Sequence, residues 1–322
     1  MKDRPEGTRV WTAEQRQRIE ADHTFQRAVE LELEPVHGVF DAAHLKEVNR
    51  RLFQDLPGAG FEDVTPGQFR KPVPDGLDWM KQRGLSSIEG AFYVAYSRMD
   101  GAARARLDNA LEKASPEALR GLKTPEFSAR FAAIYTELDY AHPFSDGNSR
   151  TLRSFTRQLA RQAGYSVDWE RFSRSAVGRD LLYIARDLSV NALAKHHVQH
   201  ENTLRKILYT QDRLDGNRAL PDLLRDAIRP SRALAFEQLD EAQALQEYPE
   251  LKEAYQIMHR AVAHFASTMQ NQPQAQQACI QYVRNHVQDC LNAGETADFS
   301  GNQEQEKRQP PPQGMGSGPL TR

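Results

Sequence analysis

The spacing of apolar residues constrains the fold of this chain most, because they recur every three or four positions in most segments. Segment 127–140 shows this pattern clearly, with one apolar face formed by Phe127, Phe131, Ile134, Tyr135 and Leu138. Alternation of the kind typical of half-buried strands is scarce. We therefore expect a mainly α-helical protein, of the all-α class.

Three further segments refine this expectation. Residues 40–55 are predicted to form a helix that ends before "PGAG" at 57–60, and residues 151–163 form another that ends at Gly164. For the helix that contains 127–140, Thr124 is placed to cap it and Pro125 suits its first turn. The aromatic and β-branched run "AFYVAY" at 91–96 is the best strand candidate, in a short hairpin or at an edge.

Composition excludes several classes of function. Among 322 residues the net charge is −2 and the hydrophobic fraction 39%. This balance argues against bulk attraction to nucleic acid, and no apolar run is long enough to cross a bilayer. The opening "MKDRPEGTRV" lacks the apolar core of a secretory signal, so a cytoplasmic protein is expected, with delivery into another cell as an effector left open.

Cysteine and histidine spacing gives no strong metal or disulfide signal. Cys279 and Cys290 lie on one face of a predicted helix but roughly 16 Å apart, too far for a bridge. His196 and His200 have the i, i+4 spacing that can bind a metal, but no third ligand is evident. We interpret them as a polar helix face.

The stretch "HPFSDGNSRTLR" at 142–153 lies between two predicted helices and concentrates reactive groups. A helix N-terminus after Gly147 would attract anions, and Arg150 and Arg153 would lie on one face of that helix, where they can grip phosphate oxygens. Asp146 offers a carboxylate of the kind that binds Mg²⁺ together with phosphates. His142 can take a proton near neutral pH.

Each of these residues alone is more commonly a loop residue, a turn or a solvated helix face. Their combination within twelve positions at a loop-to-helix junction favours a site that holds phosphates.

The stretch resembles the signature of Fic (filamentation induced by cAMP) domain proteins, HPFx(D/E)GNGRxxR, and the resemblance extends over residues 24–210. It implies a Fic fold with a short β-hairpin flap, preceded by an extension at 1–23. We expect a helical C-terminal region at 211–295, with an apolar stripe formed by Leu251, Tyr255, Met258, Val262 and Phe265, and a disordered tail at 296–322.

The resemblance further implies a protein adenylyltransferase that moves AMP from ATP to a Tyr, Ser or Thr hydroxyl of a target protein. His142 would be the general base and Asp146 would hold Mg²⁺. The nucleotide phosphates would be bound by Gly147, Asn148, Ser149, Arg150 and Arg153. The flap that docks the target would be the segment Phe92, Tyr93, Val94, Ala95 and Tyr96.

Ser149 departs from the family's usual glycine, which keeps two alternatives open. One is a Fic enzyme that transfers another phosphate-containing group. The other is a degenerate Fic domain that acts as a binding or scaffold module.

Regulation is the last expectation drawn from the resemblance. Relatives are held inactive by a glutamate, in the pattern (S/T)xxxE(G/N), that pairs with the second signature arginine, here Arg153. Neither "SSIEG" at 86–90 nor "SGNQEQ" at 300–305 matches that pattern cleanly. We therefore expect a small antitoxin-like partner to supply the glutamate.

Overall fold

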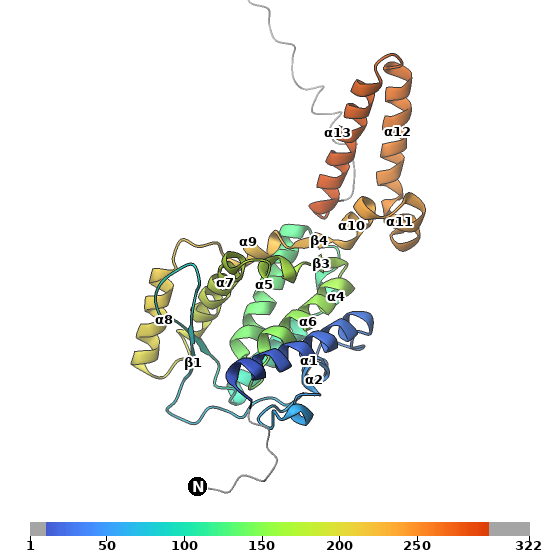
Figure 1. Ribbon diagram of the computed structural model, residues 1–322. Helices are drawn as coiled ribbons and strands as arrows, with labels where there is room; N and C mark the ends of the chain where they lie inside the picture. The colour runs from blue at the N-terminus through green and yellow to red at the C-terminus, as the bar shows by residue number, and fades with distance from the viewer. Residues whose placement is uncertain (1–10, 296–322) are drawn as a thin grey trace, which may run out of the picture. The chain divides into compact units, whose positions relative to one another are not determined.

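The computed structural model describes residues 11–295, and helices dominate it (Figure 1). Among these residues no helix is both long and apolar enough to span a membrane. The helices and strands, in chain order, are α1 (Ala13–Leu33), α2 (Ala42–Phe53), β1 (Trp79–Arg83), β2 (Phe92–Tyr96), α3 (Gly101–Lys113), α4 (Pro116–Leu119), α5 (Thr124–Ala141), α6 (Asn148–Gln162), β3 (Tyr165–Val167), α7 (Ala176–Ala194), α8 (Glu201–Arg213), α9 (Leu220–Arg225), β4 (Ile228–Pro230), α10 (Ser231–Gln238), α11 (Glu241–Glu247), α12 (Lys252–Thr268) and α13 (Pro273–Asn292).

Helix α5 is the centre of the main core, and α3, α6, α7 and α9 pack around it (Figure 1). Its predicted apolar face is confirmed, since Phe127, Phe131 and Leu138 are fully buried. Thr124, the predicted cap, is instead the first helical residue of α5, and the N-cap is Lys123. Pro125 occupies the first turn, as expected.

The helices on either side of the signature also form where the sequence predicts them. Asp41 caps α2 by accepting a hydrogen bond from the backbone of His44, and the chain then turns at 57–60. Helix α6 buries Leu152 and Phe155, and Gly164 follows it with a φ of +86°.

The predicted strand is confirmed as β2, the second strand of an antiparallel hairpin with β1. A second small sheet, β3 with β4, was not predicted, because each of its strands has only three residues and shows no alternation. Strand β4 ends at Pro230 and separates α9 from α10.

The chain divides into two compact units at Ser231/Arg232, about twenty residues beyond the predicted boundary at 210. The difference arises because α9 packs on α5, and β4 pairs with β3, so both belong to the first unit. Helix α1, most of which precedes residue 24, packs against α2 in that unit.

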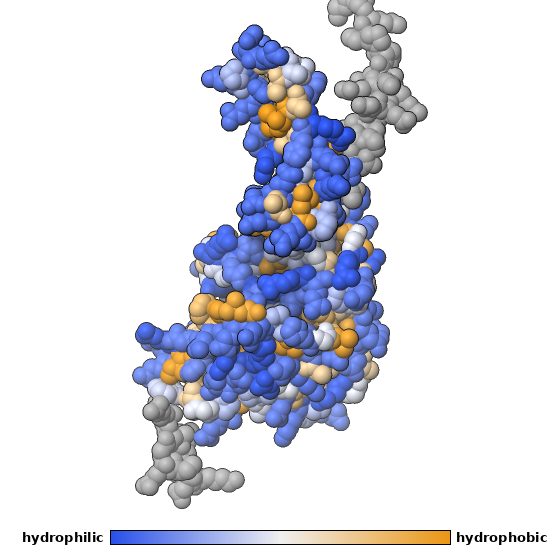
Figure 2. All heavy atoms as spheres, turned by 90° about the vertical axis from the view of Figure 1, so that its right-hand side faces the viewer, coloured by the Kyte–Doolittle hydropathy of each residue, from blue (hydrophilic) through white to orange (hydrophobic). Residues whose placement is uncertain are grey.

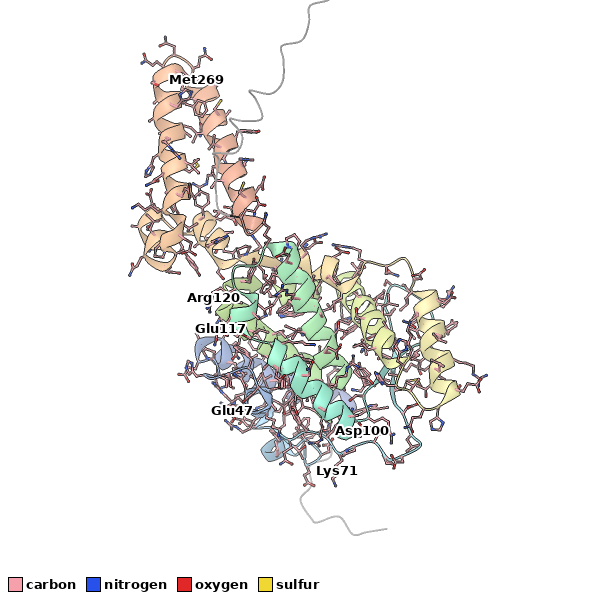
Figure 3. All side chains as sticks on the ribbon, turned by 180° about the vertical axis from the view of Figure 1, so that it is seen from behind. Glu47, Lys71, Asp100, Glu117, Arg120 and Met269 are labelled. Carbon is pink, nitrogen blue, oxygen red and sulfur yellow. The ribbon has the colours of Figure 1, made fainter. Side chains whose placement is uncertain are left out.

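The second unit consists of a helical hairpin, α12 and α13, together with α11 and α10 from Arg232 onward, and these helices enclose a small core of their own. Of the predicted stripe, Leu251, Tyr255 and Met258 are buried, whereas Val262 is exposed. Met269 lies at the tip of the hairpin (Figure 3).

The face shown in Figure 2 is mostly hydrophilic, and the apolar side chains visible on it lie in small separate patches. In the view of Figure 3, Asp100 marks the start of α3, where it accepts a hydrogen bond from the backbone of Ala103.

Candidate active site

The signature forms a tight loop between the C-terminus of α5 and the N-terminus of α6. Two residues give it its shape, because His142 (φ +45°) and Gly147 (φ +71°) both have left-handed backbones. His142 ends α5 by donating its backbone N–H to the carbonyl of Leu138. A non-glycine residue with this conformation is uncommon and is found where surrounding structure enforces it.

Gly147 is required by its backbone and by its neighbour. A Cβ at this position would lie 2.1 Å from Cζ of Phe53 in α2. The ring of Phe53 therefore packs against the bare Cα, and the start of α6 is fixed against α2.

The side chain of Asn148 is engaged within the signature loop itself. Its Oδ1 accepts from the backbone N–H of Phe144 (2.9 Å) and its Nδ2 donates to the carbonyl of Phe144 (2.7 Å). The side chain is buried and fully engaged, so it clamps the loop. Asn148 can contribute to anion binding through its backbone.

The N-terminus of α6 has the free amides that an anion cradle requires. The backbone N–H groups of Asn148, Ser149 and Arg150 belong to the first turn and have no carbonyl partner within the helix. Together with the helix dipole they favour an anion at this point. This is the feature that the spacing of the signature predicted.

His142 is buried beneath the β1–β2 hairpin. Its ring stacks on Tyr96 of β2 at 3.8 Å between centroids, and Trp79 of β1 meets it edge-on at 5.7 Å. Nε2 lies 3.1 Å from Nζ of Lys81 in β1. Burial lowers the pKa of His142 to about 4; Asp139 opposes this shift and Lys81 adds to it. The imidazole is therefore neutral at pH 7, as a general base must be.

Two buried charges behind His142 escaped sequence reasoning. Asp139 of α5 and Arg186 of α7 form a bidentate ion pair, with hydrogen bonds of 2.8 to 3.0 Å. Although burial opposes it, Arg186 holds the pKa of Asp139 near 2. Asp139 could have been found from its i, i+3 spacing to His142. Arg186 lies far away in sequence, and a charge among buried residues of α7 was its only signal.

Arg70, in the "PGQFR" segment, is a third missed residue. Its guanidinium donates to the carbonyls of His142 (2.8 Å) and Ser97 (2.6 Å) and stacks on the ring of Trp79. It thus neutralises the carbonyl end of α5 and fixes the loop.

Ser149 lies between two arginines. Its Oγ accepts from Nη1 of Arg186 at 3.3 Å and from Nη2 of Arg153 at 3.4 Å. Arg153 also donates to the carbonyl of Ser149, and no carboxylate in the described part of the chain pairs with it. Arg153 thus stands beside the cradle with its guanidinium available to a further anion.

Arg150 is turned away from the cradle, toward α1. It forms an ion pair with Glu20, donates to Oγ of Thr24 at 3.0 Å and lies over the ring of Phe53. The sequence led us to expect that the Arg150 guanidinium binds phosphates. In the structure its anionic partner is the Glu20 carboxylate.

Asp146 is exposed at the mouth of the loop, and its Oδ1 accepts from the backbone N–H of Gly147 at 2.7 Å. No cluster of three or more metal-ligating side chains is present in residues 11–295. A lone carboxylate beside an anion cradle nevertheless fits Mg²⁺, which binds through one or two carboxylates plus substrate phosphates.

The predicted flap segment is the inner strand of the hairpin. The backbone of Tyr93 is held by Thr210 and Asn191, and the N–H of Ala95 also donates to Asn191. Both edges of β2 are therefore occupied, which corrects the expectation that 92–96 can pair with a target. The open edge belongs to β1, where the backbones of Met80 and Gln82 face away from β2.

The remaining candidates lie outside this site. Helix α7 ends at Ala194, so His196 and His200 do not share a helix face, which corrects that interpretation. "SSIEG" is part of the β1–β2 loop, and "SGNQEQ" lies outside the described residues. Cys279 and Cys290 are free thiols on α13.

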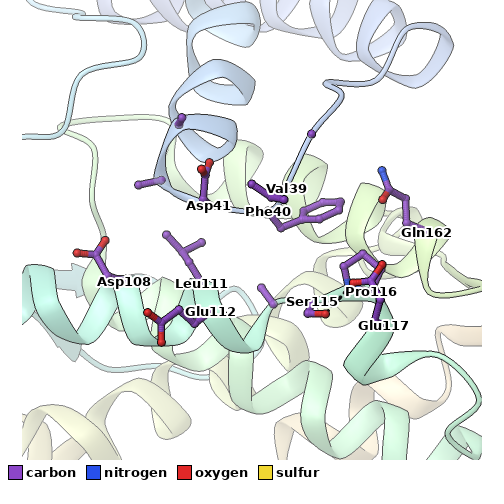
Figure 4. Close-up of a pocket in the computed structure, with 14 residues that line it drawn as sticks. Val39, Phe40, Asp41, Asp108, Leu111, Glu112, Ser115, Pro116, Glu117 and Gln162 are labelled. Atoms are coloured by element: carbon purple, nitrogen blue, oxygen red, sulfur yellow. Dashed lines mark hydrogen bonds between the residues drawn. The ribbon is translucent and has the colours of Figure 1, made fainter.

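A cavity of about 520 Å³ lies elsewhere, between α2, α3 and α4 (Figure 4). Acidic side chains line it, including Asp41, Asp108 and Glu112, but none of the signature residues does. We therefore assign the active site to the signature loop, whose chemistry the cavity lacks.

Residues 39–160 match the model of the Fic/DOC family. The chain carries a Fic domain. Its matched range contains the whole signature loop, and the observed mainly helical fold with a β-hairpin and C-terminal helices agrees with the fold the resemblance implied.

Two curated relatives are similar to this chain. The protein adenylyltransferase VbhT of Bartonella schoenbuchensis is 28% identical over 199 residues, which are 61% of this chain and 37% of the relative. A protein adenylyltransferase of Bartonella henselae is 28% identical over 152 residues, 47% of this chain and 27% of the relative. The matches thus span about a third of the relatives' length.

Solved structures include similar Fic domains. One, from a VirB-translocated effector of Bartonella quintana with bound ADP, has a TM-score of 0.47 and 24% identity, and the alignment covers 71% of this chain and 91% of that chain. BepC of Bartonella tribocorum with bound AMPPNP has a TM-score of 0.44 and 19% identity, with 69% and 90% covered.

Proposed function

We propose that this Fic domain is a protein adenylyltransferase, which transfers AMP from ATP to a Tyr, Ser or Thr hydroxyl of a target protein. The observation that carries the proposal is the placement of a neutral, buried His142 one short loop before the free amides of α6. The names of the two curated relatives agree with this reaction.

In the proposed reaction Nε2 of His142 removes the proton from the target hydroxyl. The oxygen attacks the α-phosphorus, the bond from that phosphorus to the bridging oxygen breaks, and pyrophosphate leaves. The amides of Asn148 and Ser149 stabilise the charged phosphates, and Arg153 adds a cation. Bound at Asp146, Mg²⁺ would supply further charge neutralisation on the phosphates.

The target would add a strand to the open edge of β1, beside Lys81 and His142. Met80 and Gln82 present unpaired backbone groups there, which is the usual requirement for strand addition. The hairpin is anchored by the ion pair between Arg83 and the buried Asp187, so its position over His142 is fixed.

Arg153 is also the proposed point of inhibition. Since no carboxylate of residues 11–295 pairs with it, an antitoxin-like partner could supply one. Such a carboxylate would occupy the position of a nucleotide phosphate.

The test is incorporation of label from ATP by the full chain in a cell lysate. Label at the α-phosphate should appear on a discrete protein band and be lost in His142→Ala. His44→Gln is a matched control, since His44 is also buried but lies between Phe40 and Phe155, away from the loop. A band that persists in His142→Ala would contradict the proposal.

Ser149 supports a second candidate, because its hydroxyl between two arginines changes the cradle relative to glycine. Label arriving from the γ-phosphate alone would indicate transfer of another phosphate-containing group. An absence of heat on titration with ATP and Mg²⁺ would instead indicate a binding module.

A further inference from the structure

The ion pair between Asp139 and Arg186 lies directly behind the base. Asp139 is completely buried in α5, and Arg186 of α7 is 3% exposed. Three hydrogen bonds join the two side chains, so the carboxylate cannot rotate freely. A buried pair of this kind is costly to desolvate, and stability alone is a weak reason for its presence.

The carboxylate faces the ring nitrogen of His142 that points away from the hairpin. Oδ1 of Asp139 lies 3.8 Å from Nδ1, which is buried and has no hydrogen-bond partner among the described residues. A lone pair on Nδ1 would be repelled by this charge, whereas a proton on Nδ1 would be attracted to it. On the other side of the ring, Nε2 faces the ammonium of Lys81, which can only donate.

We propose that Asp139 is a positioning residue for His142: its carboxylate, held by Arg186, keeps the imidazole proton on Nδ1 and leaves Nε2 as the acceptor. The inference rests on the proposed function, in which Nε2 takes the target's proton. Orientation of a catalytic histidine by a carboxylate is a general solution to the choice of tautomer.

Arg186 extends this support to the anion cradle. Its Nη2 binds both oxygens of Asp139, while its Nη1 donates to Oγ of Ser149 at 3.3 Å. The lone pairs of that hydroxyl are thus used by arginines, and its hydrogen remains to donate to a phosphate oxygen. The Arg186 guanidinium therefore links Asp139, behind the base, to Ser149 in the anion cradle, and so limits how far the two can move apart.

Asp139→Asn distinguishes this role from a structural one. Arg186 only donates, so it retains the amide oxygen and the amide NH₂ is left to face Nδ1. Because an amide NH₂ donates, Nδ1 must then accept, and the imidazole proton moves to Nε2. Nε2 is then no longer able to accept the proton of the target hydroxyl. Shape and volume change little, so a purely structural role would leave the tautomer unaltered.

The experiment uses the full chain labelled with ¹⁵N-histidine, in which loss of one signal in His142→Ala assigns His142. At pH 7 the wild type should show a proton on Nδ1 and a bare Nε2, and Asp139→Asn should show the reverse. AMP transfer in that variant should fall roughly 10²- to 10⁴-fold. Glu137→Gln is the control, because Glu137 is an arginine-paired acid of the same helix as Asp139 but faces Arg106; it should keep the wild-type tautomer.

A wild-type His142 with its proton on Nε2 would overturn the proposal, whether or not Asp139→Asn folds. An unchanged tautomer and rate in a folded Asp139→Asn, with His142→Ala inactive, would overturn the positioning role and leave the proposed function standing. Arg186→Lys keeps the Asp139 charge, so it should keep the tautomer and lose less activity than Asp139→Asn. Transfer that persists in His142→Ala would contradict the proposed function itself.

Discussion

Nζ of Lys81 lies 3.1 Å from Nε2 of His142. The ammonium thus blocks Nε2, the atom that accepts a proton in the proposed reaction. Lys81 belongs to β1, the strand whose open edge would receive the target. A target hydroxyl must displace Lys81 before the reaction begins. Docking on the hairpin and access to the base are therefore linked through one side chain.

Replacing Lys81 by methionine should raise the pKa of His142 from about 4, because the ammonium lowers it. The other charged or titratable groups near the ring are Asp139, Arg186 and Tyr96, and all are unchanged by the substitution. The acid limb of kcat/KM for AMP transfer should then move to higher pH. A pH–rate profile measures it.

Lys46→Met is the matched control, since Lys46 lies over the ring of Phe69 rather than beside the ring of His142. Its acid limb should coincide with that of the wild type. An unshifted limb in Lys81→Met would mean that the contact with His142 is absent in solution.

The stability of the chain should depend on pH through His142. The folded-state pKa of about 4 lies below the ordinary histidine pKa of about 6.5, so the unfolded chain binds a proton first as the pH falls. Stability is therefore retained above pH 6.5 and lost toward pH 4, by about 2 kcal/mol between pH 7 and 5. Urea unfolding of wild type and His142→Gln at both pH values should show a smaller loss in the variant.

Most of the fold was predictable because its helices carry their own signals. The apolar face of α5, the cap of α2 at Asp41 and the stop at Gly164 are all local in sequence. The β3–β4 sheet was not predictable, since three-residue strands have no period and form through pairing between segments about sixty residues apart.

The site was predictable only along the signature. His142, Gly147 and the start of α6 follow from one stretch of sequence, but their partners do not. Lys81 and Arg186 belong to elements that are distant in sequence. No local pattern indicates which charged side chains of such elements become buried. The misplaced flap has the same cause, because burial of β2 by α7 and α8 is a tertiary effect.

Glu20→Gln should lower the KM for ATP roughly two- to fivefold, since the Glu20 carboxylate competes with phosphate for Arg150. The pair is partly exposed, so the effect is modest. Asp63→Asn is the control: it removes the partner of Arg16 on the same helix without touching the loop. A KM that is unchanged or higher in Glu20→Gln would show that Arg150 serves α1 rather than the nucleotide.

Gly147→Ala should destabilise the first unit by about 3 kcal/mol or more, because a left-handed φ and a close contact act together. The new Cβ would lie 2.1 Å from Cζ of Phe53, forcing α2 and α6 apart. Gly164→Ala is the matched control, since Gly164 has a φ of +86° and nothing within 4 Å of its Cβ position. That variant should lose only about 1 kcal/mol in urea unfolding, and equal losses in the two would contradict the contact with Phe53.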